Sequence, residues 1–340
     1  MGKKKKKSSG RGLLKAACWV FGLIFTGMLG ITVYAEYLLG KMNYSFDGQS
    51  MTLEEAYDYL TRETDPEDDN YTGPEMDAGD VQLGQADRIE AGAHVVNVLL
   101  VGADYQSGDR ARSDSMILCT FNTKTDTITM TSLMRDMYVQ IPGYYSNRIN
   151  AAYAIGGMEL LQETLVYNFG LQVDGVVEVD FSRFEELIDL LGGVEIELSG
   201  QEASFINTKN GDSLSAGTHT LNGAQALWYS RFRGDSSGDF GRTNRQRVVL
   251  GKLLEGYRGA SLKQLLGMMD DILPMITTDL SKREILGYVK DLFPMLTDAQ
   301  LVTQRIPAEG GYYMTRIDGM SVLVPDMEFN IEILKDTIEQ

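Results

Sequence analysis

The chain has 340 residues, 43% of them hydrophobic, and a formal net charge of -17 at pH 7. This length suits one large domain or two ordinary ones, with enough apolar residues to bury a sizeable core. A surface of this charge repels a polyanion, so the composition argues against a nucleic-acid partner. There are only two cysteines and Cys18 lies inside an apolar run, which argues against a disulfide scaffold and a cysteine-based zinc site.

The N-terminal 35 residues have the pattern of a membrane anchor. Residues 1–15 contain seven Lys or Arg and no acid, and residues 16–35 form an uncharged run, AACWVFGLIFTGMLGITVYA. Twenty such residues in a helix match a hydrocarbon core of about 30 Å. The positive-inside rule places residues 1–15 in the cytoplasm as a basic tail and everything after residue 35 outside. We therefore expect a single-pass protein of the cell membrane.

A cleaved signal peptide is the alternative interpretation of the same segment. Its apolar region is usually shorter, about 7–15 residues, and ends in a small-x-small cleavage site. Residues 33–35 form a weak V-Y-A site of this kind. The length of the run favours an uncleaved anchor over 16–35.

Residues 36–92 are predicted to be an acidic extracytoplasmic stalk. Between residues 54 and 90 there are 13 acids and two basic residues. Few large apolar residues and many turn formers predict a poorly ordered, solvated spacer. One short helix is predicted over 51–62.

Residues 93–340 are predicted to form one α/β domain. Apolar runs and alternation predict strands at 95–104, on both sides of a polar turn at 122–126 within 115–134, at 175–181 and at 194–198. Apolar stripes at helical spacing predict helices at 149–169, 182–193, 221–233 and 242–257. Alternating strands and helices favour layers in the order α/β/α. Residues 260–340 continue with helical patterns, a strand-like LVTQRIPAEG and a tail.

Two local patterns within this domain are specific enough to test. Ser182 followed three residues later by Glu185 predicts a capping box at the start of the helix over 182–193. In the helix over 149–169, a buried stripe is predicted for four residues: Leu160, Leu161, Leu165 and Val166.

Arginines cluster in four short motifs of an otherwise acidic domain. In chain order the motifs are GADYQSGDRARSDSM with Asp104, Arg112 and Asp114, SLMRDMYVQIP with Arg135, NRINAAYAIGG with Arg148, and YSRFRGDSSGDFGRTNRQR with Arg231, Arg233, Asp239, Arg242 and Gln246. Guanidinium groups bind phosphate oxygens in a bidentate fork that lysine cannot form. A positive site in a negative shell therefore indicates a phosphate ligand.

The spacing of these residues sharpens the hypothesis. Arg231 and Arg233 share a face only on extended backbone, so we expect the helix over 221–233 to end in an irregular or extended segment. Arg242 and Gln246 are four residues apart and face one side of their helix. Asp104 and Asp114 supply the hard oxygen ligands that Mg²⁺ prefers alongside substrate phosphates. Arginines and Mg²⁺ together stabilise the charge of phosphoryl transfer. A single Arg–Asp pair is more often a structural salt bridge than a site, so the joint occurrence of the motifs is the signal.

The motifs also resemble a known family. VNVLLVGAD, RSDSMIL, SLMRDMYVQIP, RINAAYAIGG, VEVDFSRFEELIDLLGGVEIEL and LNGAQALWYSRFR…GDFGRTNRQRVVL follow one another over residues 95–257 in the order of the LytR–CpsA–Psr family of cell-envelope proteins. The resemblance implies an α/β/α domain with a hydrophobic tunnel for a polyprenyl chain. It also implies a phosphotransferase that moves teichoic acid, capsule or a similar glycopolymer from a polyprenyl pyrophosphate carrier to peptidoglycan.

The resemblance assigns roles residue by residue. Asp104 and Asp114 are expected to hold Mg²⁺. The pyrophosphate is expected to contact Arg112, Arg135, Arg148, Arg231, Arg233, Arg242 and Gln246, although the family commonly has lysine where Arg148 stands. Catalytic roles are expected for Arg135, Arg231, Arg233 and Asp239, with Asp239 as the candidate base. Met134 departs from the family pattern, which usually has proline there.

Two other functions are compatible with these residues. A polyprenyl-pyrophosphate hydrolase would use water as the acceptor, and a non-catalytic protein would only bind the lipid carrier or organise envelope assembly. The complete set of carboxylates and arginines favours an enzyme, because a scaffold has no need of these charges.

Overall fold

The structure is a computed structural model that describes residues 40–41, 43–44, 50–62, 73–104, 112–256, 258, 268 and 271–339. The predicted tail and anchor at 1–15 and 16–35 lie outside the described residues. Within the described residues, no helix is both long and apolar enough to cross a membrane. The anchor therefore stays a prediction.

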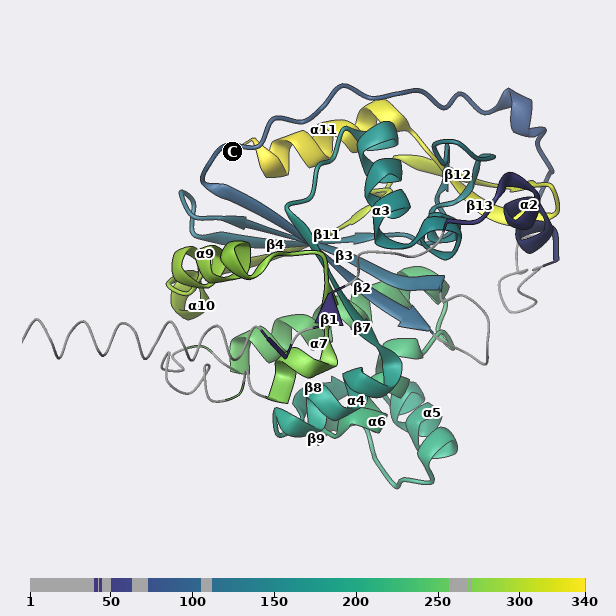
Figure 1. Cartoon of the computed structure of the whole chain (residues 1–340). Helices are drawn as coiled ribbons and strands as arrows, with labels where there is room; N and C mark the ends of the chain where they lie inside the picture. The colour runs from purple at the N-terminus through teal and green to yellow at the C-terminus, as the bar shows by residue number, and fades with distance from the viewer. Residues whose placement is uncertain are drawn as a thin grey trace, which may run out of the picture.

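A seven-stranded mixed sheet forms the centre of the domain (Figure 1). From one edge to the other its strands are β1 (Asn43–Tyr44), β10 (Thr277–Thr278), β7 (Gly175–Asp180), β2 (Val95–Asp104), β3 (Arg112–Asn122), β4 (Thr127–Leu133) and β11 (Gln300–Ile306). β2 runs parallel to β7 and antiparallel to β3, while β11 is parallel to β4. The predicted strand at 95–104 is confirmed to the residue, as is the turn after Asn122.

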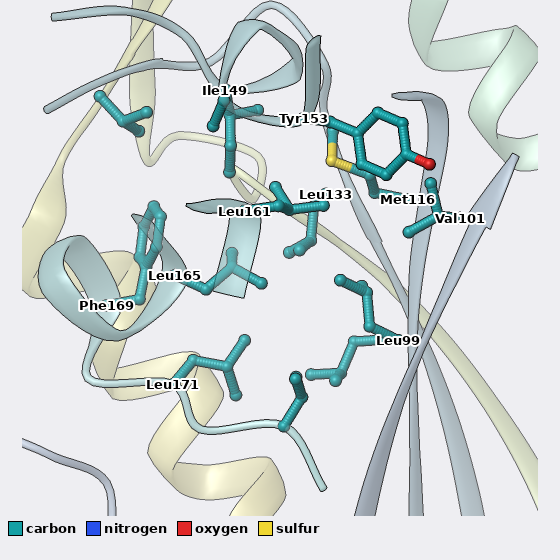
Figure 2. Packing of buried hydrophobic residues seen from close by; sticks show 14 of the residues in the cluster. Leu99, Val101, Met116, Leu133, Ile149, Tyr153, Leu161, Leu165, Phe169 and Leu171 are labelled. Atoms are coloured by element: carbon teal, nitrogen blue, oxygen red, sulfur yellow. The ribbon is translucent and has the colours of Figure 1, made fainter. Parts of the chain in front are cut away.

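Helices cover both faces of this sheet, so side chains that point to alternate faces along β3 are buried on both sides. Leu118 faces α3 (Ile149–Phe169) and α11 (Met327–Ile338) in one apolar cluster. Its neighbour Cys119 points the other way, toward Leu250 of α7 (Gly238–Gly256). Figure 2 shows side chains of the sheet pointing toward those of α3, with Leu99 and Val101 opposite Leu161 and Leu165. The predicted α/β/α layering is thus present in a mixed α/β fold.

The remaining elements surround these layers. Below the sheet in Figure 1 lie α4 (Phe181–Leu190), α5 (Gly200–Asn210), α6 (Gly223–Arg231) and the hairpin of β8 (Val194–Leu198) and β9 (Gly217–Leu221). Elsewhere are α2 (Leu53–Arg62), α9 (Lys282–Leu292), α10 (Met295–Asp298), the pair β5 (Tyr138–Val139) and β6 (Asn147–Arg148), the hairpin of β12 (Tyr312–Ile317) and β13 (Met320–Pro325), and the 3-10 turns η2 (Ala78–Asp80) and η3 (Leu273–Met275).

Three local predictions were wrong. Asp180, not Ser182, caps α4: its carboxylate accepts from the Arg183 N–H at 2.8 Å, and the Ser182 hydroxyl donates to the same carboxylate. Val166 is 40% exposed, whereas the other three residues of its predicted stripe, Leu160, Leu161 and Leu165, are buried. The expected C-terminal tail forms β12, β13 and α11, whose Leu334 and Ile338 belong to the core.

Part of the predicted stalk packs on the domain instead of being solvated. Ala56 of α2 and Ile89 are buried in the cluster between the sheet and α3. Val81 and Leu83 pack on the buried residues of the β12–β13 hairpin. The short helix predicted over 51–62 is confirmed as α2. A chain cut at residue 90 would lose these contacts.

Candidate active site

A β-bulge turns Asp114 out of the regular ladder at the end of β2 and β3. Ala103 pairs with Ser113 and Gly102 pairs with Ser115, so Asp114 is the extra residue of β3. Gly102 allows this close approach, since a Cβ there would lie 3.1 Å from Ser115 Cβ. Bulges redirect side chains in this way next to active sites. Asp104 ends β2 opposite Arg112, and its side chain lies outside the part of the chain that the structure describes.

Arg135 lies directly after β4 and reaches Asp114. The backbone of Met134 donates to Ile306 of β11 at 2.8 Å, which fixes the start of the turn. The Arg135 side chain is 6% exposed, and its Nη1 donates to Asp114 Oδ1 at 2.7 Å. Its Nε lies 3.7 Å from Asp136 Oδ1 and 3.9 Å from Asp239 Oδ1. A guanidinium this deeply buried requires such partners.

The end of α6, the segment after it and the first turns of α7 contribute Arg231, Arg233, Asp239 and Arg242. α6 begins with a capping box, in which Asn222 and Gln225 satisfy each other's backbone N–H groups. After Arg231 the helix ends at Phe232, which has extended backbone with φ -64° and ψ 130°. The prediction of an extended end is therefore confirmed. α7 then starts four residues earlier than predicted, at Gly238, and places Asp239 in its first turn.

Asp239 is the centre of an arginine cluster. Its Oδ1 lies 2.8 Å from Arg242 Nη2, 3.6 Å from Arg233 Nε and 3.9 Å from Arg135 Nε. Three of the predicted arginines, from three separate segments, therefore meet at one carboxylate. With Arg148, which lies 3.6 Å from Asp136, four guanidinium groups face the three carboxylates of Asp114, Asp136 and Asp239, which leaves one excess positive charge that an anionic ligand can neutralise.

The charges change the pKa values of this cluster. Burial alone would raise the pKa of Asp114, but Arg135, Arg242 and Arg233 outweigh it and hold the pKa below its usual range. Burial, reinforced by the positive charges of Arg135 and Arg233, lowers the pKa of Arg242 to about 10. Arg242 Nε is buried with no hydrogen-bond partner among the described residues. A buried donor of this kind costs free energy unless a ligand or water accepts from it.

Arg148 lies beside this cluster, whereas the contacts of Arg231 are with two aromatic rings. Arg148 Nη1 lies 3.6 Å from Asp136 Oδ1, while its Nε and Nη2 donate to the Ser321 carbonyl. The guanidinium carbon of Arg231 lies 4.7 Å from the centre of the Phe181 ring and 5.8 Å from that of the Trp228 ring.

Gln246 and Arg112 each form a hydrogen bond with a side-chain hydroxyl group. Gln246 Oε1 accepts from the Ser115 hydroxyl at 3.0 Å, which ties α7 to β3 next to Asp114. Arg112 contacts Tyr59 of α2. No role was predicted for Asp136, Ser115 or Tyr59, although Asp136 belongs to the SLMRDMYVQIP motif. Only Asp136 carries a signal in the sequence, its position next to Arg135.

The carboxylates at this site match the ligand set of a Mg²⁺ ion only in part. Asp114 offers carboxylate oxygens at the bulge, beside the strand end at Asp104. Within the described residues, no group of three His, Cys, Asp or Glu side chains could hold a metal ion. Two carboxylates with substrate phosphates completing the coordination remain the expectation for Mg²⁺.

Two cavities lie among the described residues without involving this cluster. A groove of about 800 Å³ follows α3 past Gly156 and Tyr167, and a pocket of about 300 Å³ lies between Thr129 and Thr337. None of the predicted site residues lines either of them. The apolar cluster of Figure 2 does adjoin the site, since Met116 follows Asp114 by two residues and Ile149 follows Arg148.

A family model for LytR_cpsA_psr proteins matches residues 63–338. The chain belongs to this family. The regulatory protein MsrR of Staphylococcus aureus (strain COL) is 42% identical over 157 residues, which are 46% of this chain and 47% of MsrR. The chain thus spans about half the length of that relative. A polyisoprenyl-teichoic acid–peptidoglycan teichoic acid transferase, TagU of Bacillus mycoides, is 31% identical over 74% of this chain and 73% of its own.

A solved family structure has the same fold. The LytR-CPS2A-psr family protein YwtF (TagT), with octaprenyl pyrophosphate lipid bound, is 28% identical and superposes with a TM-score of 0.58. The alignment covers 76% of this chain and 98% of that chain. The LytR–CpsA–Psr resemblance noted from the motifs is therefore confirmed, and the family match extends it from residue 257 to residue 338.

Proposed function

We propose that this protein is a phosphotransferase that moves a glycopolymer from a polyprenyl pyrophosphate carrier to peptidoglycan. The arginine cluster around Asp239, with Arg148 beside it, carries the proposal, because its guanidinium groups outnumber the carboxylates that contact them and a pyrophosphate supplies the missing negative charge. A relative named as a teichoic acid transferase and a family structure holding octaprenyl pyrophosphate support the same substrate class.

The proposed reaction is a displacement at the phosphorus nearest the polymer. A hydroxyl oxygen of the acceptor bonds to this phosphorus, and the bond from phosphorus to the bridging oxygen of the pyrophosphate breaks. Polyprenyl phosphate leaves with the bridging oxygen, and the acceptor hydroxyl releases its proton to Asp239 or to solvent. Arg135, Arg233 and Arg242 stabilise the charge on the phosphoryl oxygens, which is the main task in phosphoryl transfer. Arg231 is oriented by Phe181 and Trp228.

Asp114 and Asp104 would hold Mg²⁺, which supplies further charge neutralisation at the phosphates when bound. The lowered pKa of Asp114 keeps its carboxylate ionised for this role.

The polyprenyl chain would lie against the apolar layer between the sheet and α3. This layer begins beside the charged site and consists of apolar side chains, Met116 and Tyr153 among them (Figure 2). An anchor at residues 16–35 would keep the domain at the outer face of the cell membrane, where a lipid-linked donor is available.

A transfer assay with the full chain separates the three candidate functions. The protein in detergent micelles would receive Mg²⁺, a polyprenyl-pyrophosphate-linked saccharide and peptidoglycan fragments, with mass spectrometry of the products. A phosphodiester-linked product that disappears in Arg242→Gln supports transfer. Lys252→Gln is the matched control, since it removes an exposed charge from the same helix. Free sugar phosphate without linked product favours the hydrolase, and tight lipid binding without turnover favours a carrier-binding protein.

A further inference from the structure

Helix α2 precedes the family-matched residues 63–338 but is built into the domain. Ala56 at its centre is fully buried in the cluster between the sheet and α3. Met51, just before α2, donates its backbone N–H to the Ile155 carbonyl at 3.0 Å and accepts from the Tyr144 hydroxyl at 2.6 Å. α2 is therefore fixed at its start and along one side.

The break in α3 creates the acceptor for this attachment. Gly156 and Gly157 have non-helical backbone, with φ 66° and ψ -153° at Gly157, a conformation that is essentially restricted to glycine. The helical ladder is interrupted there, and the Ile155 carbonyl just before the break accepts from the Met51 N–H. A glycine pair in one element thus positions another element that precedes it by about a hundred residues in the chain.

Tyr59 on α2 contacts Arg112 in two ways. Arg112 Nε donates to the Tyr59 hydroxyl at 3.0 Å, and the guanidinium carbon lies 5.4 Å from the centre of the Tyr59 ring. Both contacts hold the guanidinium of Arg112 beside the Tyr59 side chain. Arg112 stands opposite Asp104 and two residues before the bulged Asp114, at the rim of the charged site.

We propose that Tyr59 is a positioning residue, through which α2 orients Arg112 toward the pyrophosphate and forms one wall of the site. The proposal rests on the proposed function, in which Arg112 binds that group. A long flexible side chain loses rotamer freedom when it binds a ligand, so a guanidinium that is already held in place binds with less entropy loss. The terminal nitrogens of Arg112 can form the fork to phosphate while Nε stays on Tyr59.

Binding of farnesyl pyrophosphate to the full chain in detergent micelles, followed by isothermal titration calorimetry, tests this role. From the hydrogen bond and the cation–π contact we expect Tyr59→Ala to weaken binding about tenfold and Tyr59→Phe, which keeps the ring, about threefold. Tyr57→Ala is the matched control: it removes the same ring from the same helix, but Tyr57 packs edge-on against Tyr145, with the ring centroids 6.0 Å apart. We expect this control to bind like the wild type.

A double-mutant cycle separates positioning from a structural effect. In an Arg112→Gln background, Tyr59→Ala should weaken binding no further, because the group that Tyr59 orients is gone. Equal losses in both backgrounds would overturn the proposal, as would wild-type or tighter binding by Tyr59→Ala alone. A wild-type chain that binds the probe but transfers nothing contradicts the proposed transferase, while the cycle still decides the role of Tyr59. A wild-type chain that does not bind the probe contradicts both.

Discussion

Replacing Arg135 with glutamine should destabilise the domain in a pH-dependent way. The substitution removes the 2.7 Å contact to Asp114 and the longer contacts to Asp136 and Asp239, all below the protein surface. Breaking a buried pair by removing one partner costs about 3–5 kcal/mol. Arg242 and Arg233 still act on Asp114. We therefore expect a loss of about 3 kcal/mol in the free energy of unfolding at pH 7.

The sign of the pH dependence follows from Asp114. Its pKa is lowered in the folded state, so the carboxylate contributes stability above its unfolded pKa of about 4 and loses it as pH falls through the folded pKa. The difference between wild type and Arg135→Gln should therefore shrink as the pH falls below about 4.

Urea denaturation of residues 40–340, measured by circular dichroism from pH 7 to pH 3, would follow this difference. Lys252→Gln is the control, because its ion pair with Glu255 is about half exposed and worth little. A loss that is the same at all pH values, or no loss at pH 7, would refute the reasoning.

Three further predictions concern residues away from the arginine cluster. Glu202→Gln breaks the 2.6 Å ion pair with Arg245, so we expect the free energy of unfolding in urea to fall by about 3 kcal/mol. Transfer activity per folded molecule should be unchanged, and a loss of kcat without a loss of stability would contradict this. Gly170→Ala should lower stability by about 3 kcal/mol, since φ is 64° and the new Cβ would lie 1.9 Å from the Asp87 carbonyl; a Tm equal to wild type would show the reasoning wrong. Burial raises the pKa of Cys119 to about 12, so in residues 40–340 its thiol should react with a disulfide reagent at pH 8 only in urea; rapid reaction of the native chain would disprove the burial.

The main strands and helices could be predicted because their patterns are local. The run of residues 95–104 is apolar on both sides, since both faces of the sheet are covered, and β2 has those bounds. The extended end of α6 followed from a single requirement, that Arg231 and Arg233 serve one site. Arg135, Arg233 and Arg242 were predicted together and are brought together at Asp239.

What could not be predicted depends on contacts between distant segments. The bulge at Asp114 comes from the pairing of two strands and has no sequence signature beyond Gly102. Asp180 and Ser182 are both good caps, and only the path out of β7 decides between them. The contact of Tyr59 with Arg112 joins residues 53 positions apart, through an acidic segment whose composition suggested a solvated spacer.

Oxygen-18 labelling tests the central claim, transfer to an acceptor hydroxyl, most directly. The full chain would act on the polyprenyl-pyrophosphate-linked saccharide and peptidoglycan fragments in water enriched in oxygen-18, with mass spectrometry of every phosphate-containing product. The account predicts a phosphodiester-linked product without the heavy isotope, because the acceptor supplies the attacking oxygen. Sugar phosphate that carries the heavy isotope, with no linked product, would mean that water is the acceptor and would contradict the account.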